Sequence, residues 1–453
     1  MNVVNPATGE VVHSFDAATW SEVDLRVGAL QEGFDRWRRT PVAERARLLG
    51  AISPILRRRS RDLAEMMARE MGKPVAQGRQ EIEKCAWLCD HYASAGPAML
   101  APQPVETDAH RSWVSFQPLG VVLAVMPWNF PFWQVFRAAV PALLAGNTMM
   151  LKHASNVPSS ALAIEELFGE AGIPPGTFAT ALAEADLVPR IIAHPGIAAV
   201  TLTGSVSAGR AVARVAGENL KKTVLELGGS DAYLVLADAD VEAAAELCTK
   251  SRLINAGQSC IAAKRFVVDA SICARFEMAM VGRMRAVVMG DPMREETEVG
   301  PLAREDLRDE LHRQVMDSVA RGARLLLGGE VPRQPGAWYP PTVLTGVRPG
   351  MPAYDEEMFG PVAAVIPASG EKEAIRIAND SRFGLGAAVI TADRERGAAI
   401  AELELDAGSC FVNSLVKSDP RLPFGGVRDS GYGRELGEFG IREFVNIKTV
   451  WVE

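Results

Sequence analysis

From residue 112 onward the chain alternates short apolar runs with helical stretches, and this alternation restricts its fold more than any other feature. The runs are rich in valine, which is typical of strands that are buried on both faces of a parallel sheet. Strands that alternate with helices favour a doubly wound α/β architecture. The first four runs are Val121–Val125, Thr148–Leu151, Ala198–Leu202 and Tyr233–Leu236.

The length of the chain, 453 residues, has room for two or three domains of roughly 150 residues each. A helix is expected to begin after Asp240, and a second series of strands and helices runs from Arg265 to about Phe411. We therefore expect two α/β domains that meet near residues 226–260.

The first hundred residues lack the alternation and indicate a hairpin followed by helices. Thr19 and Glu22 have the spacing of a capping box for a helix that extends through Trp37. Ser60 is expected to cap a later helix, and Gly72 is expected to end it.

Composition and charge exclude several classes of protein. Hydrophobic residues make up 48% of the chain, enough for a large core, and the net charge of −8 makes nucleic acid an unexpected partner. The N-terminus resembles no signal peptide, and the apolar runs are too short to span a membrane. Six cysteines in this length form no disulfide framework or zinc pattern, so we expect a cytoplasmic protein without a metal.

Cys260 is the cysteine whose surroundings favour chemistry. It follows Gly257, Gln258 and Ser259 at the end of a helical pattern, where the backbone is expected to turn sharply. The other five cysteines fall within apolar patterns that are typical of small core residues. A cysteine beside a turn is more often structural than nucleophilic, so the role of Cys260 has to be judged from the motifs elsewhere in the chain.

Two further residues have features of catalytic groups. Glu226 ends an apolar run before two glycines, at the sheet edge where ligand sites of α/β proteins form, and burial there raises a carboxyl pKa as a general base requires. Asn129 lies between aromatic residues and prolines in Pro127–Pro131, and its side-chain amide can stabilise an oxyanion. Taken alone, the structural readings are the more common ones: a surface glutamate before a glycine turn, and a turn with aromatic packing.

The segment Thr203–Gly209 joins a strand end to a helix, where backbone N–H groups suit a phosphate. The Rossmann fingerprint is absent. The spacing between Gly204 and Gly209 resembles a Walker motif but is followed by Arg210 in place of lysine, so an NTPase is not expected.

Together these motifs resemble the aldehyde dehydrogenase superfamily, from Asn5 to Val450, and most closely the shorter bacterial succinate-semialdehyde dehydrogenases that use NAD(P)+. Each motif is weak alone, but their order and spacing are specific. The matching segments are Pro127–Pro131, Leu151–Lys152, Thr203–Gly209, Glu226–Gly229, Gly257–Cys260, Glu356–Pro361 and Pro423–Gly426.

The resemblance implies an aldehyde dehydrogenase-like fold, with two doubly wound α/β domains and a small oligomerisation β-element. The dinucleotide-binding domain is expected over residues 1–110 and 119–226, and the catalytic domain over 227–420. The oligomerisation element is expected over 111–118 and 430–453, which makes a homodimer or homotetramer the expected assembly.

The family's mechanism makes Cys260 the nucleophile that attacks the aldehyde, Asn129 the group that holds the oxyanion, and Glu226 the base that activates water. The thiohemiacetal loses hydride to NAD(P)+, and water hydrolyses the resulting thioester to a carboxylic acid. A cysteine hydrolase or acyltransferase without nicotinamide is the alternative from another class. It would need a histidine to activate the thiol, and none of the six histidines is suitably placed. A binding or structural protein with a decayed site is disfavoured because each expected catalytic residue is present.

The resemblance also assigns residues that bind the cofactor and the substrate. Arg137 lies four residues after Trp133 on one helix face that should line the aldehyde tunnel, and a guanidinium there can bind the carboxylate of succinate semialdehyde. The alternative is that Arg137 pairs with a protein carboxylate and that the substrate is another small aldehyde. The expected cofactor residues are Trp128, Lys152, Ser155, Gly204, Ser205, Leu227, Glu357 and Phe359, and the expected substrate residues are Trp133, Arg137, Ser259 and Ser418.

Ser155 generates a prediction about the cofactor. Many similar enzymes that prefer NAD+ have a glutamate there, which would repel a 2′-phosphate, whereas Ser155 and nearby Lys152 suit NADP+. We expect NADP+ to be preferred and NAD+ to be used as well; the alternative is that Ser155 only caps a helix. Ser155→Glu should shift the ratio of kcat/KM values for the two cofactors towards NAD+. An unchanged ratio would remove Ser155 from cofactor choice.

Overall fold

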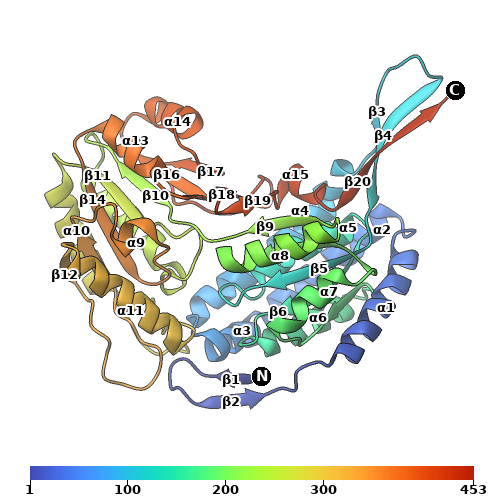
Figure 1. The fold of residues 1–453 in the computed structure, drawn as a ribbon, viewed down its shortest axis with the longest axis horizontal. Helices are drawn as coiled ribbons and strands as arrows, with labels where there is room; N and C mark the ends of the chain where they lie inside the picture. The colour runs from blue at the N-terminus through green and yellow to red at the C-terminus, as the bar shows by residue number, and fades with distance from the viewer.

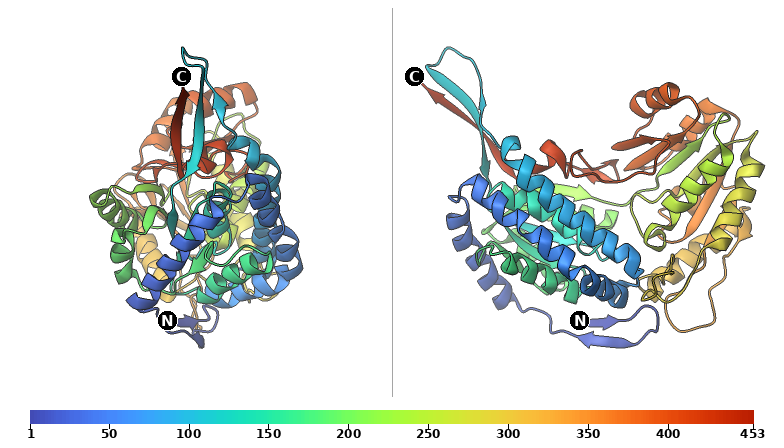
Figure 2. Two further views of the ribbon diagram at one scale, coloured as in Figure 1. Left: turned by 90° about the vertical axis from the view of Figure 1, so that its right-hand side faces the viewer. Right: turned by 180° about the vertical axis from the view of Figure 1, so that it is seen from behind.

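The computed structural model describes residues 1–453 as two α/β domains and a protruding arm (Figure 1). The chain leaves the first sheet at Glu226 and enters the second sheet at Ala232. The two domains lie side by side, and the arm extends away from both of them (Figures 1 and 2).

The first sheet has six strands in the order β19-β9-β8-β5-β6-β7. All pairs are parallel except β19 with β9. The first three apolar runs of the sequence are confirmed as strands, each with at most two additional residues at an end. The strands are β5 (Val121–Met126), β6 (Thr148–His153), β7 (Phe178–Thr180), β8 (Ile197–Thr203), β9 (Lys222–Glu226) and β19 (Gly431–Tyr432).

Helices cover both faces of this sheet, which is why its strands are apolar throughout. Along β5, Val121 and Leu123 belong to one core cluster, whereas Val122 and Ala124 belong to another on the opposite face. One face is covered by α1 (Trp20–Trp37), α7 (Val188–Ala193) and α8 (Val206–Glu218), and the other by α2 (Val42–Gly50), α3 (Ile52–Met71), α4 (Val75–Met99), α5 (Trp133–Leu144) and α6 (Pro158–Glu170).

The strand order reverses at β5, which lies between β6 and β8. In doubly wound sheets, ligands bind outside the carboxyl ends of the strands at such a switch point. The loops after β5 and β8 carry Asn129 and Gly204, and Glu226 is the last residue of β9. The topology therefore gathers segments that are far apart in the sequence at one edge.

The helix signals of the N-terminal region were correct in two places and wrong in one. Thr19 and Glu22 form the predicted capping box at the start of α1, and Gly72 ends α3 with a φ of 78°. Ser60 caps no helix, because it lies inside α3. The buried face of α3 continues past it, from Leu56 to Leu63, so the apolar periodicity outweighs the local cap signal.

The second sheet has seven strands in the order β12-β13-β14-β11-β10-β16-β17, all parallel except β12 with β13. A core cluster of 50 buried residues surrounds it. The strands are β10 (Ala232–Val235), β11 (Arg265–Asp269), β12 (Arg324–Leu327), β13 (Thr342–Thr345), β14 (Val362–Ala368), β16 (Gly386–Ile390) and β17 (Ser409–Val412). The helices are α9 (Val241–Leu253), α10 (Cys273–Ala286), α11 (Glu305–Ala320), α12 (Pro352–Asp355), α13 (Glu371–Asn379) and α14 (Arg394–Leu403).

The arm is an antiparallel sheet of β20 (Val445–Val452), β4 (Arg111–Pro118) and β3 (Gln103–Pro104). The element that the sequence suggested over 430–453 is therefore shorter at its start, because β19 returns to the first sheet and pairs with β9. The short helix α15 (Gly437–Ile441) connects β19 to the arm. The remaining strands form two small antiparallel pairs, β1 (Asn2–Val4) with β2 (Val11–Ser14) and β15 (Phe383–Gly384) with β18 (Val427–Arg428).

The N-terminal hairpin connects the two domains. The loop between β1 and β2 accepts a hydrogen bond at the Pro6 carbonyl from the Ala337 N–H (2.8 Å). The Trp338 indole N–H donates to the Ala7 carbonyl (3.1 Å). No helix combines the length and the apolar character that are needed to cross a bilayer.

The start of α6 shows whether Ser155 caps this helix, which was the alternative to a role in cofactor choice. Its cap is buried Glu70, which accepts from the backbone N–H groups of Ser159 (2.7 Å) and Ser160 (3.0 Å), so Ser155 is not the cap.

Glu70→Ala should destabilise the fold by about 1–3 kcal/mol, because it leaves these N–H groups without an acceptor. Glu65→Ala on the same helix removes only surface pairs and should cost less than about 1 kcal/mol. Equal melting midpoints for both variants would contradict the capping role.

Candidate active site

The cleft that contains Cys260 is large enough for a substrate, with a volume of about 820 Å³. It is lined by residues of α4, α5, α9 and the segment 415–418, so both domains contribute to its walls. Four residues singled out from the sequence as substrate residues line it together with Cys260: Trp133, Arg137, Ser259 and Ser418.

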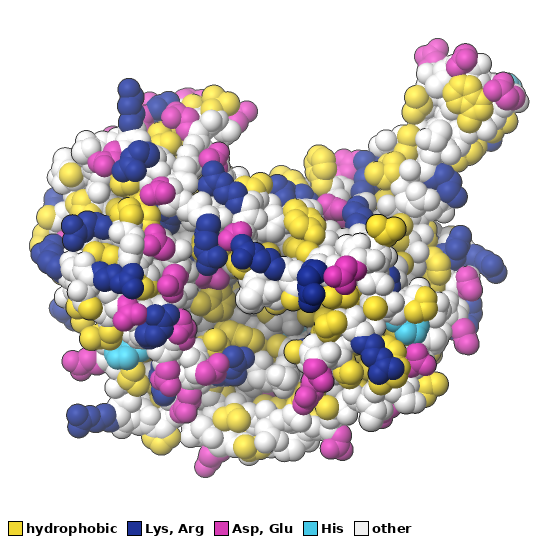
Figure 3. All heavy atoms as spheres, in the orientation of Figure 1, with side chains coloured by type: hydrophobic (Ala, Val, Ile, Leu, Met, Phe, Trp, Pro, Cys, Tyr) yellow, Lys and Arg dark blue, Asp and Glu magenta, His cyan; other side chains and the backbone are white.

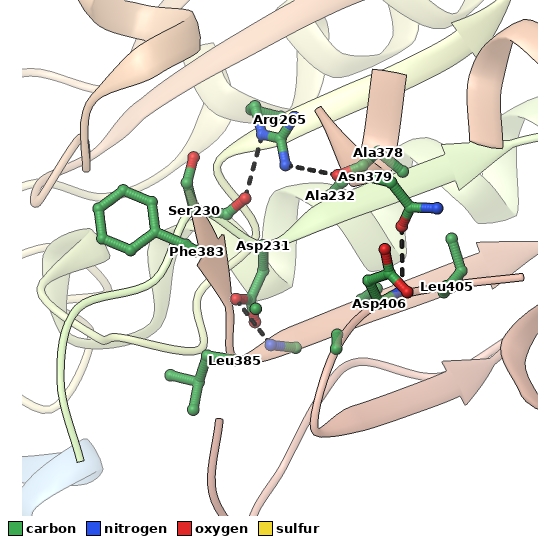
Figure 4. Close-up of a pocket in the computed structure, with 14 residues that line it drawn as sticks. Ser230, Asp231, Ala232, Arg265, Ala378, Asn379, Phe383, Leu385, Leu405 and Asp406 are labelled. Atoms are coloured by element: carbon green, nitrogen blue, oxygen red, sulfur yellow. Dashed lines mark hydrogen bonds between the residues drawn. The ribbon is translucent and has the colours of Figure 1, made fainter. Parts of the chain in front are cut away.

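A second cavity, shown in Figure 4, is too small for a substrate. Its volume of about 20 Å³ has room for a single water molecule. Around it, buried Arg265 donates to the carbonyls of Ser230 (3.1 Å) and Ala378 (2.9 Å), and Asp231 accepts from the Gly386 N–H (3.0 Å). These bonds fix the start of β10, and the cavity is part of the framework of the second domain.

Cys260 is presented by a left-handed turn. After α9 ends at Leu253, three consecutive residues have positive φ: Asn255 (53°), Ala256 (53°) and Gly257 (77°). Such a backbone is costly for residues with a side chain and persists only where the surroundings hold it. The Asn255 side chain supplies that support, donating to the carbonyls of Asn129 (2.7 Å) and Gln258 (3.2 Å).

The side chain of Asn129 points at the same turn. Its amide nitrogen donates to the carbonyl of Gln258 (3.1 Å), two residues before Cys260. An amide group has two N–H donors, so one remains for an oxyanion that forms at the thiol. The structure thus brings Asn129 and Cys260 together from different domains, as the sequence led us to expect.

Burial raises the pKa of the Cys260 thiol to about 12, although the positive charges of Arg137 and Lys264 oppose this. Lys264 is fully buried beneath the turn and donates to the carbonyls of Ser259 (2.8 Å) and Cys260 (2.7 Å). Sequence reasoning missed Lys264, because a lysine just before an apolar strand usually lies at the surface. Its position fixes the nucleophile turn and supplies the positive charge that favours a thiolate.

Glu226 is a buried carboxyl whose two oxygens have no hydrogen-bond partner. Burial raises its pKa well above the usual range, and the nearby charge of Glu435 raises it further. A methyl group on Gly425 would lie 2.7 Å from its Oε1, so only glycine leaves room for the carboxyl there. Burial thus favours the neutral form of this carboxyl, and a base role requires the ionised form.

Arg137 lines the cleft, but part of its guanidinium is held by protein groups, and its contact with a substrate carboxylate stays a prediction. Its guanidinium forms a buried ion pair with Glu435, lies 3.4 Å from the Thr203 hydroxyl, and stacks over the Phe424 ring. The pairing with a protein carboxylate, one part of the alternative that the sequence left open, is present in the structure, whereas the substrate that goes with it stays a prediction. A buried guanidinium needs an anion, and Glu435 from the segment after β19 supplies it.

Two charged residues of α4 at the cleft were also missed. Glu81 accepts from the backbone N–H groups of Phe132 and Trp133 (2.9 Å each) and pairs with buried Lys73, so it fixes the start of α5 just after Asn129. Lys84 lies one turn further along α4 and donates to the Ser418 hydroxyl (2.7 Å). Their helical spacing was visible in the sequence, but it is equally typical of a solvated helix face.

The residues expected to bind a cofactor from the first domain lie along one edge of its sheet. Lys152 is near the end of β6, is buried, and forms no ion pair. Ser205 caps α8, accepting from the Ala208 N–H (3.2 Å), and Gly204 precedes it. Exposed Ser155 follows β6. A helix N-terminus beside an unpaired buried cation suits a phosphate-bearing ligand.

The second domain also contributes residues that were expected to bind the cofactor. Phe359 contacts Trp128 edge-on, with ring centroids 5.8 Å apart. Glu357 accepts from the Gly229 N–H (3.0 Å) and lies 3.5 Å from the Lys264 ammonium. Leu227 packs against Gly209 at the start of α8, where a side chain would collide with it. The surface is hollowed between the two domains (Figure 3).

The arrangement combines a cysteine on a left-handed turn, an amide donor and a buried carboxyl with a surface suited to a dinucleotide. The model of the aldehyde dehydrogenase family matches residues 1–450. The chain belongs to the aldehyde dehydrogenase family. This aldehyde dehydrogenase is an oxidoreductase, which sets aside a hydrolase without nicotinamide.

Similar proteins extend over the whole chain. The succinate semialdehyde dehydrogenase Sad of Escherichia coli, named for NAD(P)+, is 49% identical over 451 residues, which cover 99% of this chain and 97% of that protein. Succinate-semialdehyde dehydrogenase 1 of Mycobacterium tuberculosis, named for NADP+, is 47% identical and covers 99% of both chains. The crystal structure of succinic semialdehyde dehydrogenase from Streptococcus pyogenes with NADP+ aligns with a TM-score of 0.97 at 38% identity, covering 100% of this chain and 99% of that one.

Proposed function

We propose that this aldehyde dehydrogenase oxidises succinate semialdehyde to succinate, with NADP+ preferred and NAD+ also used. The observation that carries the proposal is the placement of Cys260 in a cleft that also contains Trp133, Ser259 and Ser418, set beside Asn129. The names of the similar proteins agree with this substrate and cofactor. Another small aldehyde or semialdehyde is the alternative substrate.

In the proposed mechanism, the Cys260 sulfur attacks the aldehyde carbon, and the thiol proton leaves the site. The free N–H of Asn129 and the backbone N–H of Cys260 donate to the oxyanion. NAD(P)+, held by residues such as Gly204, Ser205 and Lys152, would supply the acceptor for the hydride that leaves the thiohemiacetal as the thioester forms on Cys260. Once ionised, Glu226 takes a proton from the water that attacks the thioester and passes it to the departing sulfur, so succinate leaves and the thiol forms again.

The cofactor is proposed to contact residues of both domains. Gly204, Ser205 and the N-terminus of α8 would hold the pyrophosphate, and Lys152 and Glu357 the riboses. Ser155 is exposed and free of any capping bond, so it leaves space for a 2′-phosphate. The aromatic and apolar residues proposed to enclose the nicotinamide end are Trp128, Leu227 and Phe359.

We also propose that the protein is a cytoplasmic homodimer or homotetramer. Its six cysteines are all free, as a reducing compartment would keep them. Strand β20 has an unpaired outer edge, and Ile447 and Trp451 on it are exposed. An apolar edge strand of this kind invites pairing with a second chain.

Glu226 should be needed chiefly after hydride transfer. We expect Glu226→Gln to give a burst of NADPH, then slow turnover, with an acyl adduct on Cys260 detected by mass spectrometry. Because burial raises the pKa of Glu226, the fraction of ionised carboxyl and with it wild-type kcat should increase as the pH rises, and the variant should lose this dependence. Cys260→Ala is the control and should show neither burst nor adduct. Loss of both signals in Glu226→Gln would place its role before hydride transfer.

The substrate assignment is tested by comparing succinate semialdehyde with butanal. A single charge-assisted contact to the distal carboxylate contributes about 1.5–3 kcal/mol, so kcat/KM should be about ten- to a hundredfold higher for succinate semialdehyde. Reduction of each cofactor is followed at 340 nm, and Cys260→Ala should be inactive with both aldehydes. Equal kcat/KM values for the two aldehydes would reject a carboxylate-bearing substrate in favour of another small aldehyde.

A further inference from the structure

Side-chain donors hold the carbonyls of all four residues in the segment 257–260, which ends in the proposed nucleophile. Buried Arg252 donates to the first carbonyl (2.6 Å), and two asparagines donate to the second. Lys264 donates to the last two, those of Ser259 (2.8 Å) and Cys260 (2.7 Å). A single ammonium group therefore sets the orientation of the peptide groups on both sides of the reacting residue.

The hydrogen bond from Lys264 also fixes the direction of the Cys260 N–H. In a trans peptide the N–H points opposite to the carbonyl of the preceding residue, which here is Ser259. Because the Ser259 carbonyl is turned towards Lys264, the Cys260 N–H is turned away from it, and it donates to no protein group. This N–H is the backbone donor that the proposed mechanism assigns to the oxyanion. Without Lys264, the peptide that carries it would lose its anchor.

Lys264 brings a buried charge to the same place. Its side chain is fully buried, and the carboxylate nearest to its ammonium is that of Glu357, at 3.5 Å. Glu357 can approach because residue 228 is glycine, since a methyl group there would collide with its carboxylate. The same carboxylate also accepts from the Gly229 N–H (3.0 Å). A positive charge that is only partly compensated therefore lies beneath Cys260.

We propose that Lys264 is a positioning residue that makes the Cys260 sulfur reactive, and that Glu357 opposes it. The inference rests on the proposed function, because it takes Cys260 to be the group that attacks the aldehyde. Lys264 stabilises negative charge, first on the thiolate and then on the oxyanion, through its own charge and through the peptide that it holds. Glu357 has the opposite effect because its carboxylate offsets part of that charge. This effect is separate from its proposed contact with the cofactor ribose.

The charged groups that face the thiol come from both domains. Arg137 of α5 and Lys264 lower the pKa of the Cys260 thiol against the effect of burial. Glu357 and Asp231 raise it. Burial raises the pKa of Asp231 itself to about 6, so this carboxyl is ionised throughout the alkaline range and its effect there is constant.

The ionisation of Lys264 gives the proposal a pH signature. Burial lowers the pKa of the Lys264 ammonium, and the charge of Arg252 lowers it as well. Glu357, Asp231 and Cys260 have the opposite effect. The ammonium favours the thiolate only while it is protonated, so its effect is complete below its pKa and is lost as the pH rises through it. The gain in reactivity that Lys264 provides should therefore narrow in the alkaline range.

The experiment measures alkylation of Cys260 by iodoacetamide, a neutral reagent that attacks the thiolate, from about pH 7 to about pH 10. The full-length enzyme is used before cofactor is added, and peptide mass spectrometry separates Cys260 from the other cysteines. Lys264→Gln keeps a donor for the carbonyls but removes the charge. It should be alkylated about tenfold more slowly than wild type at neutral pH, as a thiol pKa raised by about one unit requires, and the difference should shrink towards the alkaline end.

Two further variants complete the set. Glu357→Gln should be alkylated about two- to tenfold faster than wild type, because it removes the opposing charge. Lys221→Gln is the matched control. Lys221 also donates to two backbone carbonyls (2.6 Å each), but it precedes β9, at the opposite end of that strand from Glu226, and its variant should behave as wild type. Melting midpoints report whether each variant folds, and Glu357→Gln carries the test if Lys264→Gln does not.

Activity measurements show whether the same residue acts on the reaction. In Lys264→Gln, kcat/KM should fall by the same factor for succinate semialdehyde and for butanal, because Lys264 acts at the reacting end of the aldehyde. The fall should be at least as large as the loss in alkylation rate, since the oxyanion is affected in addition to the thiolate. A loss confined to succinate semialdehyde would contradict the inference.

The outcomes separate this inference from the proposed function. A Cys260→Ala enzyme that still oxidises aldehydes would reject the nucleophile, and the inference with it. If Cys260→Ala is inactive but Lys264→Gln is alkylated as fast as wild type, Lys264 alone is rejected and the function stands. Alkylation of Lys264→Gln that is slower by one constant factor at every pH would indicate altered access to the thiol, and it would overturn the inference, as would slower alkylation of Glu357→Gln.

Discussion

The parallel pairing of β5, β6, β8 and β9 is the constraint on which the site depends. Parallel strands end at the same edge of a sheet, so loops that are far apart in the sequence are brought together there. Asn129, Lys152 and Glu226 reach the site in this way, from three separate strand ends. The second domain completes it by presenting Cys260 opposite that edge. Strands joined by hairpins alternate in direction, so the ends of neighbouring strands would lie at opposite edges and these side chains would not converge.

Buried charges then fix the local geometry. Three pairs surround the cleft: Lys73 with Glu81, Arg137 with Glu435, and Lys264 with Glu357. Leaving one member of such a pair alone would cost several kcal/mol, so each pair strongly favours one arrangement of its surroundings. Through hydrogen bonds to backbone groups, these pairs hold the start of α5 and the turn at Cys260.

Much of the fold could be predicted from the sequence, because buried parallel strands leave a strong apolar signal. The runs at Val121, Thr148 and Ala198 all became strands of the first sheet. Weaker signals were misleading. Ser60 looked like a cap but lies within a helix whose apolar face continues, and the two-residue strand β19 is too short to produce a pattern. Its pairing with β9 depends on an edge that exists only in the folded sheet.

The sequence by itself determined the chemistry available to this protein: a cysteine at a turn, a carboxyl at a strand end, an amide between prolines, and the family that these motifs define. It did not determine which charges are paired. Arg137 appeared to be the natural partner of a substrate carboxylate, and Lys84 appeared to be an ordinary helix residue. In the folded chain Arg137 pairs with Glu435, and Lys84 donates to the Ser418 hydroxyl. The reason is physical, since an ion pair forms between whichever opposite charges the fold brings within a few ångströms, and that proximity is not written in local sequence.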